Sequence, residues 1–208
     1  GMYLFAPFKT GVQGHWSEDS LVAVPLLAGK NNYYLGFLSA MKFWDLTEQL
    51  PRTVYIILKK RKKSFEALGS KFIFVKKKSF GEIMSQKIGG AAINVSSREQ
   101  TILDGLLFPQ YCLGLSEVAK AINSSKSELD FGKLVLLAKK EKSIVRRRLG
   151  FLLEVLKISV KAKKIEENFK GFIWLDPTSK KNLLGYSKKW GLKLNLSEKE
   201  LLYFLEGY

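Results

Sequence analysis

Histidine and cysteine are almost missing from this 208-residue sequence, which contains one of each, His15 and Cys112. A single cysteine cannot form a disulfide bond within the chain, and its rarity is typical of proteins kept in a reducing cytoplasm. A catalytic triad, a cysteine–histidine pair or a histidine-based metal site would have to be built on His15, which lies in a glycine-containing loop. The sequence therefore predicts no enzyme activity, no cofactor and no metal site.

Long apolar runs and nucleotide-binding motifs are missing as well. The apolar stretches are interrupted by lysine, serine or glycine and stay well short of the ~18–20 residues of a membrane span. The N-terminus lacks the pattern of a signal peptide, and neither a GxxxxGK[ST] loop nor a GxGxxG motif occurs. Gly69-Ser70 is not followed by the pair of aspartates that holds Mg²⁺ in a nucleotidyltransferase, and Asp176 lacks the second carboxylate of a nuclease. We expect a cytoplasmic protein that does not associate with membranes.

Acidic residues are scarce relative to basic ones. The chain has 35 lysines and arginines against 19 aspartates and glutamates, a formal net charge of +16 and a pI near 9.8. This excess favours an anionic partner, either nucleic acid or an acidic protein, although a lysine-rich surface also keeps a protein soluble. Trp190, beside two lysines, could stack on a base or anchor a hairpin. The candidate nucleic-acid contacts are Lys59, Lys60, Arg61, Lys62, Lys63, Lys76, Lys77, Lys78, Arg146, Arg147, Lys188, Lys189 and Trp190.

The middle of the chain has the pattern of a β-sheet. Residues 53–58 (TVYIIL) are rich in β-branched side chains and predict a strand that is buried on both faces. A second strand is expected over 72–75, and strands over 83–88 and 91–95 flank Gly89-Gly90, a pair typical of a two-residue hairpin turn. We therefore expect a mainly antiparallel sheet of about four strands.

Helical spacing of apolar residues predicts that helices pack on this sheet. One helix is expected from Ser17 or Asp19 to Gly29, and another from Tyr34 to Trp44. Serine followed three residues later by Glu or Gln marks two helix starts, at 96–100 and at Ser197. The other predicted elements are helices ending before Pro109 and spanning 115–123, 128–140 and 143–157, and a hairpin of 172–175 with 192–196.

The predicted fold class is α+β, with the sheet and its helices followed by a helical segment and a C-terminal hairpin plus helix. Residues 31–158 are expected to form the α+β core domain. Residues 159–208 are expected to form a basic C-terminal extension, and residues 1–30 a short strand and a linking helix. No internal repeat or low-complexity segment occurs.

Several short motifs follow one another along residues 33–200. The first combines Leu38-Ser39-Ala40 with Leu46-Thr47-Glu48-Gln49 and Pro51, and the second is VSSREQTILD at 95–104. The later ones are Pro109-Gln110-Tyr111 with Gly114-Leu115, Arg148-Leu149-Gly150, and Lys189-Trp190-Gly191-Leu192 with Asn195. In this order they resemble the motifs of AbiEi-type antitoxins, the antitoxin and transcriptional-regulator half of type IV toxin–antitoxin systems. The positions that we interpret as structural are Ser39, Ala40, Leu46, Glu48, Gln49, Pro51, Arg98, Glu99, Thr101, Leu103 and Asp104.

The resemblance implies a non-enzymatic protein that neutralises a nucleotidyltransferase-like toxin and associates with DNA. Family members usually begin with a winged-helix domain that represses their own operon. Residues 3–7 (YLFAP) resemble the last wing strand of that domain, so we expect most or all of it to be missing here. Asp45 stands where the family often has glycine, and Glu99 is interpreted as a helix cap. The alternative is a stand-alone basic module that binds nucleic acid, mainly through phosphates, without an antitoxin role.

Overall fold

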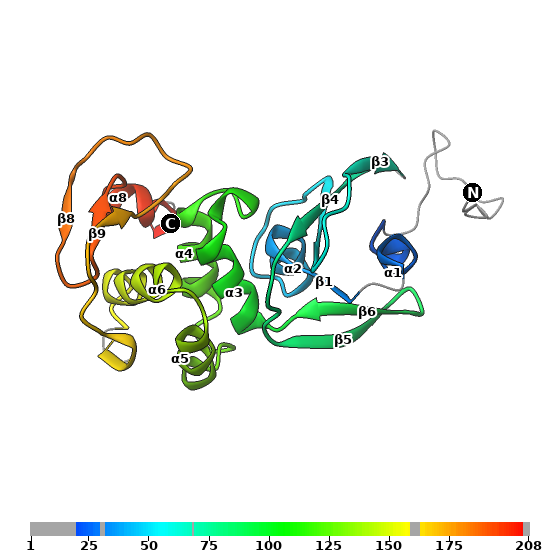
Figure 1. Ribbon diagram of the computed structural model, residues 1–208, viewed down its shortest axis with the longest axis horizontal. Helices are drawn as coiled ribbons and strands as arrows, with labels where there is room; N and C mark the ends of the chain where they lie inside the picture. Colours follow the sequence, from blue (N-terminus) through cyan, green and yellow to red (C-terminus); the bar gives the residue numbers. More distant parts are fainter. Residues whose placement is uncertain (1–19, 30–31, 68, 159–162, 206–208) are drawn as a thin grey trace.

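The computed structural model describes residues 20–29, 32–67, 69–158 and 163–205, and its elements follow one another along the long axis of the molecule (Figure 1). A six-stranded sheet lies at one end, a three-stranded sheet lies at the other, and helices α3 to α6 lie between them. The α+β class is therefore confirmed. The strand predicted over residues 3–7 lies outside the described residues.

The larger sheet is mixed, with the strand order β3-β4-β2-β1-β6-β5. Its outer pairs, β3 with β4 and β5 with β6, are antiparallel, and so is the central pair of β1 with β2. Strand β2 runs parallel to β4, and β1 runs parallel to β6. The strands are β1 (Tyr33–Leu35), β2 (Thr53–Leu58), β3 (Phe65–Ala67), β4 (Ser70–Lys76), β5 (Ile83–Ile88) and β6 (Ala91–Ser96).

The prediction of about four mainly antiparallel strands is wrong, because β1 and β3 were not predicted and two of the strand pairings are parallel. The predicted helix begins at Tyr34, but all three side chains of Tyr33–Leu35 are buried, so the strand shows no alternation of apolar and polar residues. The following helix, α2 (Phe37–Phe43), starts only after Gly36. By contrast, β2 has the predicted bounds, and β5 and β6 form the predicted hairpin, with Ile88 opposite Ala91 across Gly89-Gly90.

The remaining helices agree closely with the predicted ones. Ser97 caps α3, since its Oγ accepts a hydrogen bond from the Gln100 N–H at 3.2 Å, and the helix ends before Pro109. At Ser197 both hydrogen bonds of the predicted capping box with Glu200 are present. The helices are α1 (Val24–Ala28), α3 (Arg98–Leu107), α4 (Leu115–Ser124), α5 (Phe131–Lys140), α6 (Ser143–Val155) and α8 (Glu198–Leu201), with 3-10 turns at Ser20–Ala23, Pro109–Tyr111, Lys163–Ile165 and Tyr203–Leu205.

The predicted C-terminal hairpin is also wrong, because its two strands are parallel. Strand β7 (Ile173–Trp174) pairs in parallel with β9 (Leu192–Leu194). The basic loop between them contains a further strand, β8 (Gly185–Ser187), which pairs antiparallel with β9 and gives the order β7-β9-β8. Parallel strands need a crossover connection. Here β8 runs in the opposite direction to β7, so the chain returns to the end of the sheet where β7 begins and β9 then runs parallel to β7.

Two buried apolar clusters stabilise this arrangement. The larger one fills the space among the helices and one face of the six-stranded sheet, and it includes Ile57 and Trp190. The smaller one covers the other face of that sheet, where α1 packs on Val54 and Ile56. Strand β2 is thus buried on both faces, as its sequence predicts.

Candidate nucleic-acid interface

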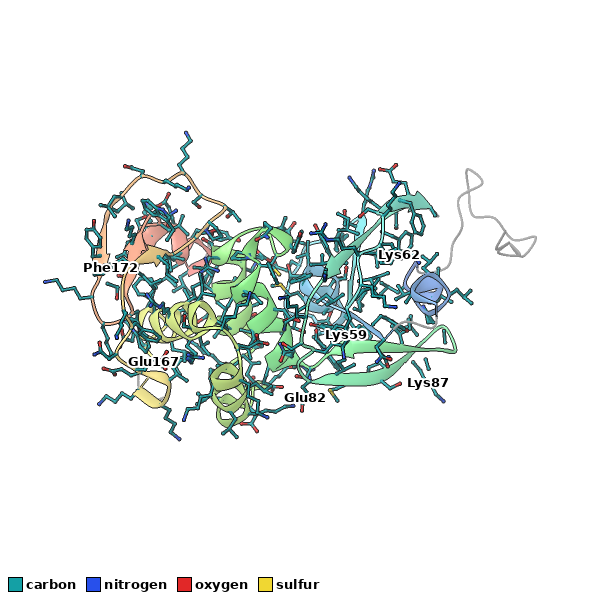
Figure 2. The ribbon with its side chains drawn as sticks, viewed as in Figure 1. Lys59, Lys62, Glu82, Lys87, Glu167 and Phe172 are labelled. Atoms are coloured by element: carbon teal, nitrogen blue, oxygen red, sulfur yellow. The ribbon has the colours of Figure 1, made fainter. Side chains whose placement is uncertain are left out.

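The structure separates the predicted cations into exposed and buried ones. All five from Lys59 to Lys63 are exposed in the loop that follows β2. Lys59 and Lys62 lie over the rings of Phe80 and Phe74 at 5.3 and 4.9 Å, and Figure 2 shows Lys62 on the side of the sheet near α1. Lys62 also donates a hydrogen bond to the Leu27 carbonyl at the end of α1. These contacts hold the loop against the sheet.

The end of β4 and the turn between α5 and α6 enclose a pocket of about 370 Å³, which we call the basic cleft. This volume lies within the usual range of ligand sites. Six basic side chains and a single carboxylate line the cleft, and part of its wall is apolar. The lining residues are Arg61, Lys76, Lys77, Lys78, Ser79, Leu107, Phe108, Lys140, Glu141 and Lys142.

Beneath the cleft lies a buried polar cluster, which we call the Lys77 network. The Lys77 Nζ forms ion pairs with Asp104 at 2.6 Å and with Glu141 at 2.9 Å. Gln100 Nε2 donates to the same two carboxylates at 3.0 and 3.1 Å, and the Tyr34 hydroxyl donates to Asp104 at 2.9 Å. The network therefore joins the end of β4, helix α3 and the α5–α6 turn.

The carboxylates of the Lys77 network neutralise the charge of Lys77. This side chain is only 5% exposed, so we remove it from the candidate nucleic-acid contacts. Burial alone lowers the pKa of the Lys77 ammonium, but the contacts with Asp104 and Glu141 outweigh it and raise that pKa above its ordinary value. Lys77 is therefore cationic at neutral pH and is neutralised by the carboxylates around it.

The other cations of the cleft are Arg61, Lys76, Lys78, Lys140 and Lys142, and all five are exposed. Within the part of the chain that the structure describes, none of them forms an ion pair with a carboxylate. Glu141, the one acidic residue in the lining, already contacts Lys77. The cleft thus presents concentrated positive charge that the protein itself does not neutralise.

Two of these cations were missing from the predicted set. Lys140 and Lys142 belong to the KKEK run at 139–142, where α5 ends and α6 has not yet begun. Basic residues are common in the last turn of a helix, since they favour the negative end of its dipole, so the run by itself does not indicate a binding site. Its position opposite β4 depends on tertiary packing, which the sequence does not display.

Arg146 contacts the backbone of the α5–α6 turn, which lines the cleft. Its guanidinium donates to the Glu141 carbonyl at 2.6 Å and binds the Glu167 carboxylate at 2.9 and 3.1 Å. Arg146 was predicted to contact phosphate. Its guanidinium is instead bound to the Glu141 carbonyl and the Glu167 carboxylate, and these contacts stabilise the α5–α6 turn. Lys188 and Lys189 lie instead in the turn between β8 and β9, where Lys189 pairs with Glu154 and Glu166.

Arg147 and Trp190 are buried and cannot contact a ligand at the surface. Arg147 donates to the carbonyls of Gly171 at 2.8 Å and Gly191 at 2.9 Å. Trp190 has no exposed surface, and a Cβ atom on Gly150 would lie 2.2 Å from its ring. Trp190 is therefore not available for base stacking, and its position corresponds to the alternative interpretation, an anchor for the last strands.

Most residues of the first family-like motif pack between α2 and the sheet. Ser39 is buried, accepts a hydrogen bond from the Tyr55 N–H at 2.9 Å and donates one to the Thr53 carbonyl at 3.2 Å. Ala40 and Leu46 are buried as well. Glu48 and Gln49 are exposed and Pro51 is partly exposed, and Glu48 pairs with Lys120 at 2.9 Å.

The second motif lies on α3. Arg98 packs over the Trp44 ring at 4.8 Å and pairs with Glu128. Glu99 was expected to cap its own helix, but its carboxylate instead accepts hydrogen bonds from the Asp130 N–H at 3.2 Å and from Lys133 at 3.1 Å, at the start of α5. Thr101, Leu103 and Asp104 are fully buried.

Neither a metal-binding cluster nor a membrane-spanning helix occurs among the described residues. Among them, no group of three or more His, Cys, Asp or Glu side chains could hold a metal ion. Cys112 is buried, which raises the pKa of its thiol. No helix in the described ranges is both long and apolar enough to cross a membrane.

Comparison with known proteins identifies the fold but no family. No protein-family model matches the sequence, and neither does any curated protein. Among solved structures, the chain is similar to the RV2827C protein from Mycobacterium tuberculosis, with a TM-score of 0.63 and 11% sequence identity. The match covers 90% of this chain and 72% of that protein. At this level of identity the likeness concerns the fold alone.

Proposed function

We propose that this chain is a non-enzymatic regulator that resembles AbiEi-type antitoxins and contacts DNA phosphates through the basic cleft. The observation that carries the DNA contact is the convergence of five exposed cations on one pocket. Protein packing does not require these side chains, and no carboxylate of the described chain pairs with them. A phosphate backbone supplies the missing negative charge.

The chemistry of the cleft favours phosphate contact over the reading of bases. Four of the five cations are lysines, whose flexible stems carry a compact charge with no fixed hydrogen-bonding plane. Bound phosphates release condensed counterions, and each contact adds about 0.9 to the slope of log K against log salt on duplex DNA. Binding through the cleft is therefore expected to depend steeply on salt and little on sequence.

The resemblance to antitoxins is supported by where its motif residues lie. Gly150, from the Arg-Leu-Gly motif, leaves room for Trp190, from the Lys-Trp-Gly-Leu motif. Asp104, at the end of the second motif, belongs to the Lys77 network. Asp45, where the family often has glycine, has a φ of 54°, a conformation that glycine adopts without steric cost. Motifs that are distant in sequence thus have consistent roles in one fold.

Co-expression tests the antitoxin role directly. The open reading frames that flank this gene are screened for a nucleotidyltransferase-like toxin, the candidate is induced alone and together with this chain, and bacterial growth is recorded. The proposal predicts arrest with the toxin alone and growth when both are present. Persistent arrest, with this chain soluble at a level above that of the toxin, would show that the antitoxin role is wrong.

The second candidate function is a stand-alone module that binds nucleic acid without any toxin partner. The basic cleft favours it by itself, because phosphate contact requires no second protein. It predicts salt-dependent DNA binding in a chain that fails to restore growth in the co-expression test. The two experiments together separate the candidates, since only the regulator gives both results.

A further inference from the structure

The three-stranded sheet carries aromatic residues on the face that points away from the core. Trp174 of β7 is paired with Lys193 of β9, and Lys193 is paired with Tyr186 of β8. Phe172 lies two residues before Trp174 and contacts Tyr186 edge to face, with ring centroids 5.1 Å apart. We call Phe172, Trp174, Tyr186 and Lys193 the aromatic face.

The alternation of the strands shows that this face is the outer one. Ile173 and Leu194 pack against the large core cluster, and Leu192 is fully buried within it. Side chains next to them along a strand point the opposite way. Phe172 and Tyr186 are accordingly 45% and 52% exposed, and Figure 2 shows Phe172 at the outer edge of the molecule, beyond the helices.

Two buried arginines of α6 hold this sheet rigidly. Arg147 donates to the carbonyls of Lys170 and Gly171 before β7 and of Gly191 before β9. Arg148 donates to the Leu175 carbonyl at 2.7 Å, just after β7. Burial lowers the pKa of Arg148 to about 10, so it remains cationic at neutral pH. The exposed rings are therefore presented on a fixed platform.

The charge that the small sheet and its loops supply is mostly positive, although one of their lysines, Lys189, is paired with Glu154 and Glu166. Residues 170–195 contain six lysines and a single acidic residue, Asp176. Asp176 is only 2% exposed, and its carboxylate accepts hydrogen bonds from the Leu115 N–H at 2.8 Å and the Thr178 N–H at 2.7 Å. Lys193 lies over the Trp174 ring at 5.5 Å, which places a cation among the aromatic residues. A partner of this face must carry negative charge and flat apolar groups.

We propose that the aromatic face binds single-stranded nucleic acid. Unpaired bases stack on Phe172, Tyr186 and Trp174, while the phosphates between them lie near Lys193 and Lys188. Interleaved aromatic and basic side chains on a sheet are suited to this ligand, because every base has a face that can stack. A duplex keeps its bases inside and offers no rings to these side chains. The inference goes beyond the phosphate contact at the basic cleft and involves a different part of the molecule, the three-stranded sheet.

The test compares binding of a fluorescently labelled single strand, twelve thymidines long, with binding of a duplex of the same length. The substitutions Phe172→Leu and Tyr186→Leu keep an apolar side chain but remove the aromatic ring. Loss of one stacked base is expected to raise the single-strand Kd by about 5- to 150-fold. Duplex binding, which depends on the basic cleft, is expected to stay unchanged.

The control is Leu183→Ala, which truncates an exposed apolar side chain outside the three strands. A second readout is quenching of tryptophan fluorescence by the oligonucleotide, compared between the unchanged chain and Trp174→Leu because the sequence contains four tryptophans. Unchanged single-strand affinity in both ring-removing variants would overturn the proposal, as would an equal loss for single strand and duplex. A dimer in sedimentation that these variants dissociate would also overturn it, because the face would then serve self-association.

Discussion

Replacing Lys77 by methionine should destabilise the protein by about 3 kcal/mol, the lower part of the range for breaking a buried ion pair. Asp104 has no exposed surface and Glu141 sits at the base of the cleft, so the substitution leaves two poorly solvated carboxylates without their cation. The cost stays at the lower end because Gln100 and Tyr34 still donate hydrogen bonds to Asp104. The assay is urea denaturation followed by circular dichroism, with the slope of the transition unchanged.

Lys76→Met is the matched control, because Lys76 is the neighbouring residue and is exposed. Its effect should stay within about 0.5 kcal/mol, as for most surface substitutions. The double variant Lys77→Met, Asp104→Leu should recover part of the loss, since an apolar pair in place of a buried ion pair is often neutral. A loss below about 1 kcal/mol in Lys77→Met, or equal losses at Lys76 and Lys77, would refute the role assigned to the network.

Three further outcomes are expected. Gly150→Ala should destabilise the fold by about 1–3 kcal/mol, because the new Cβ overlaps the Trp190 ring, and a thermal melt with no decrease in Tm would contradict this. Ser197→Ala should cost about 1 kcal/mol by removing the cap of α8, as measured by urea denaturation against Lys87→Ala. Because the pKa of Lys77 is raised in the folded state, its contribution is complete below its ordinary value and is lost as pH rises past about 10.5. Urea titrations at alkaline pH should show a larger loss in the unchanged chain than in Lys77→Met, where other groups with raised pKa values, such as Tyr34 and Lys133, still titrate.

Features decided by local interactions could be predicted from the sequence. The cap at Ser97 and the capping box at Ser197 each involve residues three apart, and the Gly89-Gly90 turn fixes its hairpin. Strand β2 was identifiable because a run of β-branched residues has few alternatives. In each case the atoms that determine the conformation lie within one short segment of the chain.

Features decided by distant contacts could not be predicted in this way. Strand β1 is three residues long and wholly buried, so neither its length nor its pattern distinguishes it from a helix start. The burial of Lys77 has no decisive local indication: neighbours on an extended chain point to opposite sides, but all five cations of the run 59–63 are exposed. The partner of Lys77, Glu141, is 64 residues away, and nothing local predicts that the two segments form one cleft.

The measurement that tests the central claim most directly is the salt dependence of duplex DNA binding, between about 50 and 200 mM salt. If all five cleft cations contact phosphates, the slope of log K against log salt approaches about −4.5. The double variant Lys140→Gln with Lys142→Gln should reduce the magnitude of this slope by about 1.8. The control double variant, Lys87→Gln with Lys126→Gln, changes two exposed lysines outside the cleft lining and should leave the slope unchanged. Binding that does not depend on salt, or a slope that both double variants alter equally, would contradict the assignment of the basic cleft as the phosphate-binding site.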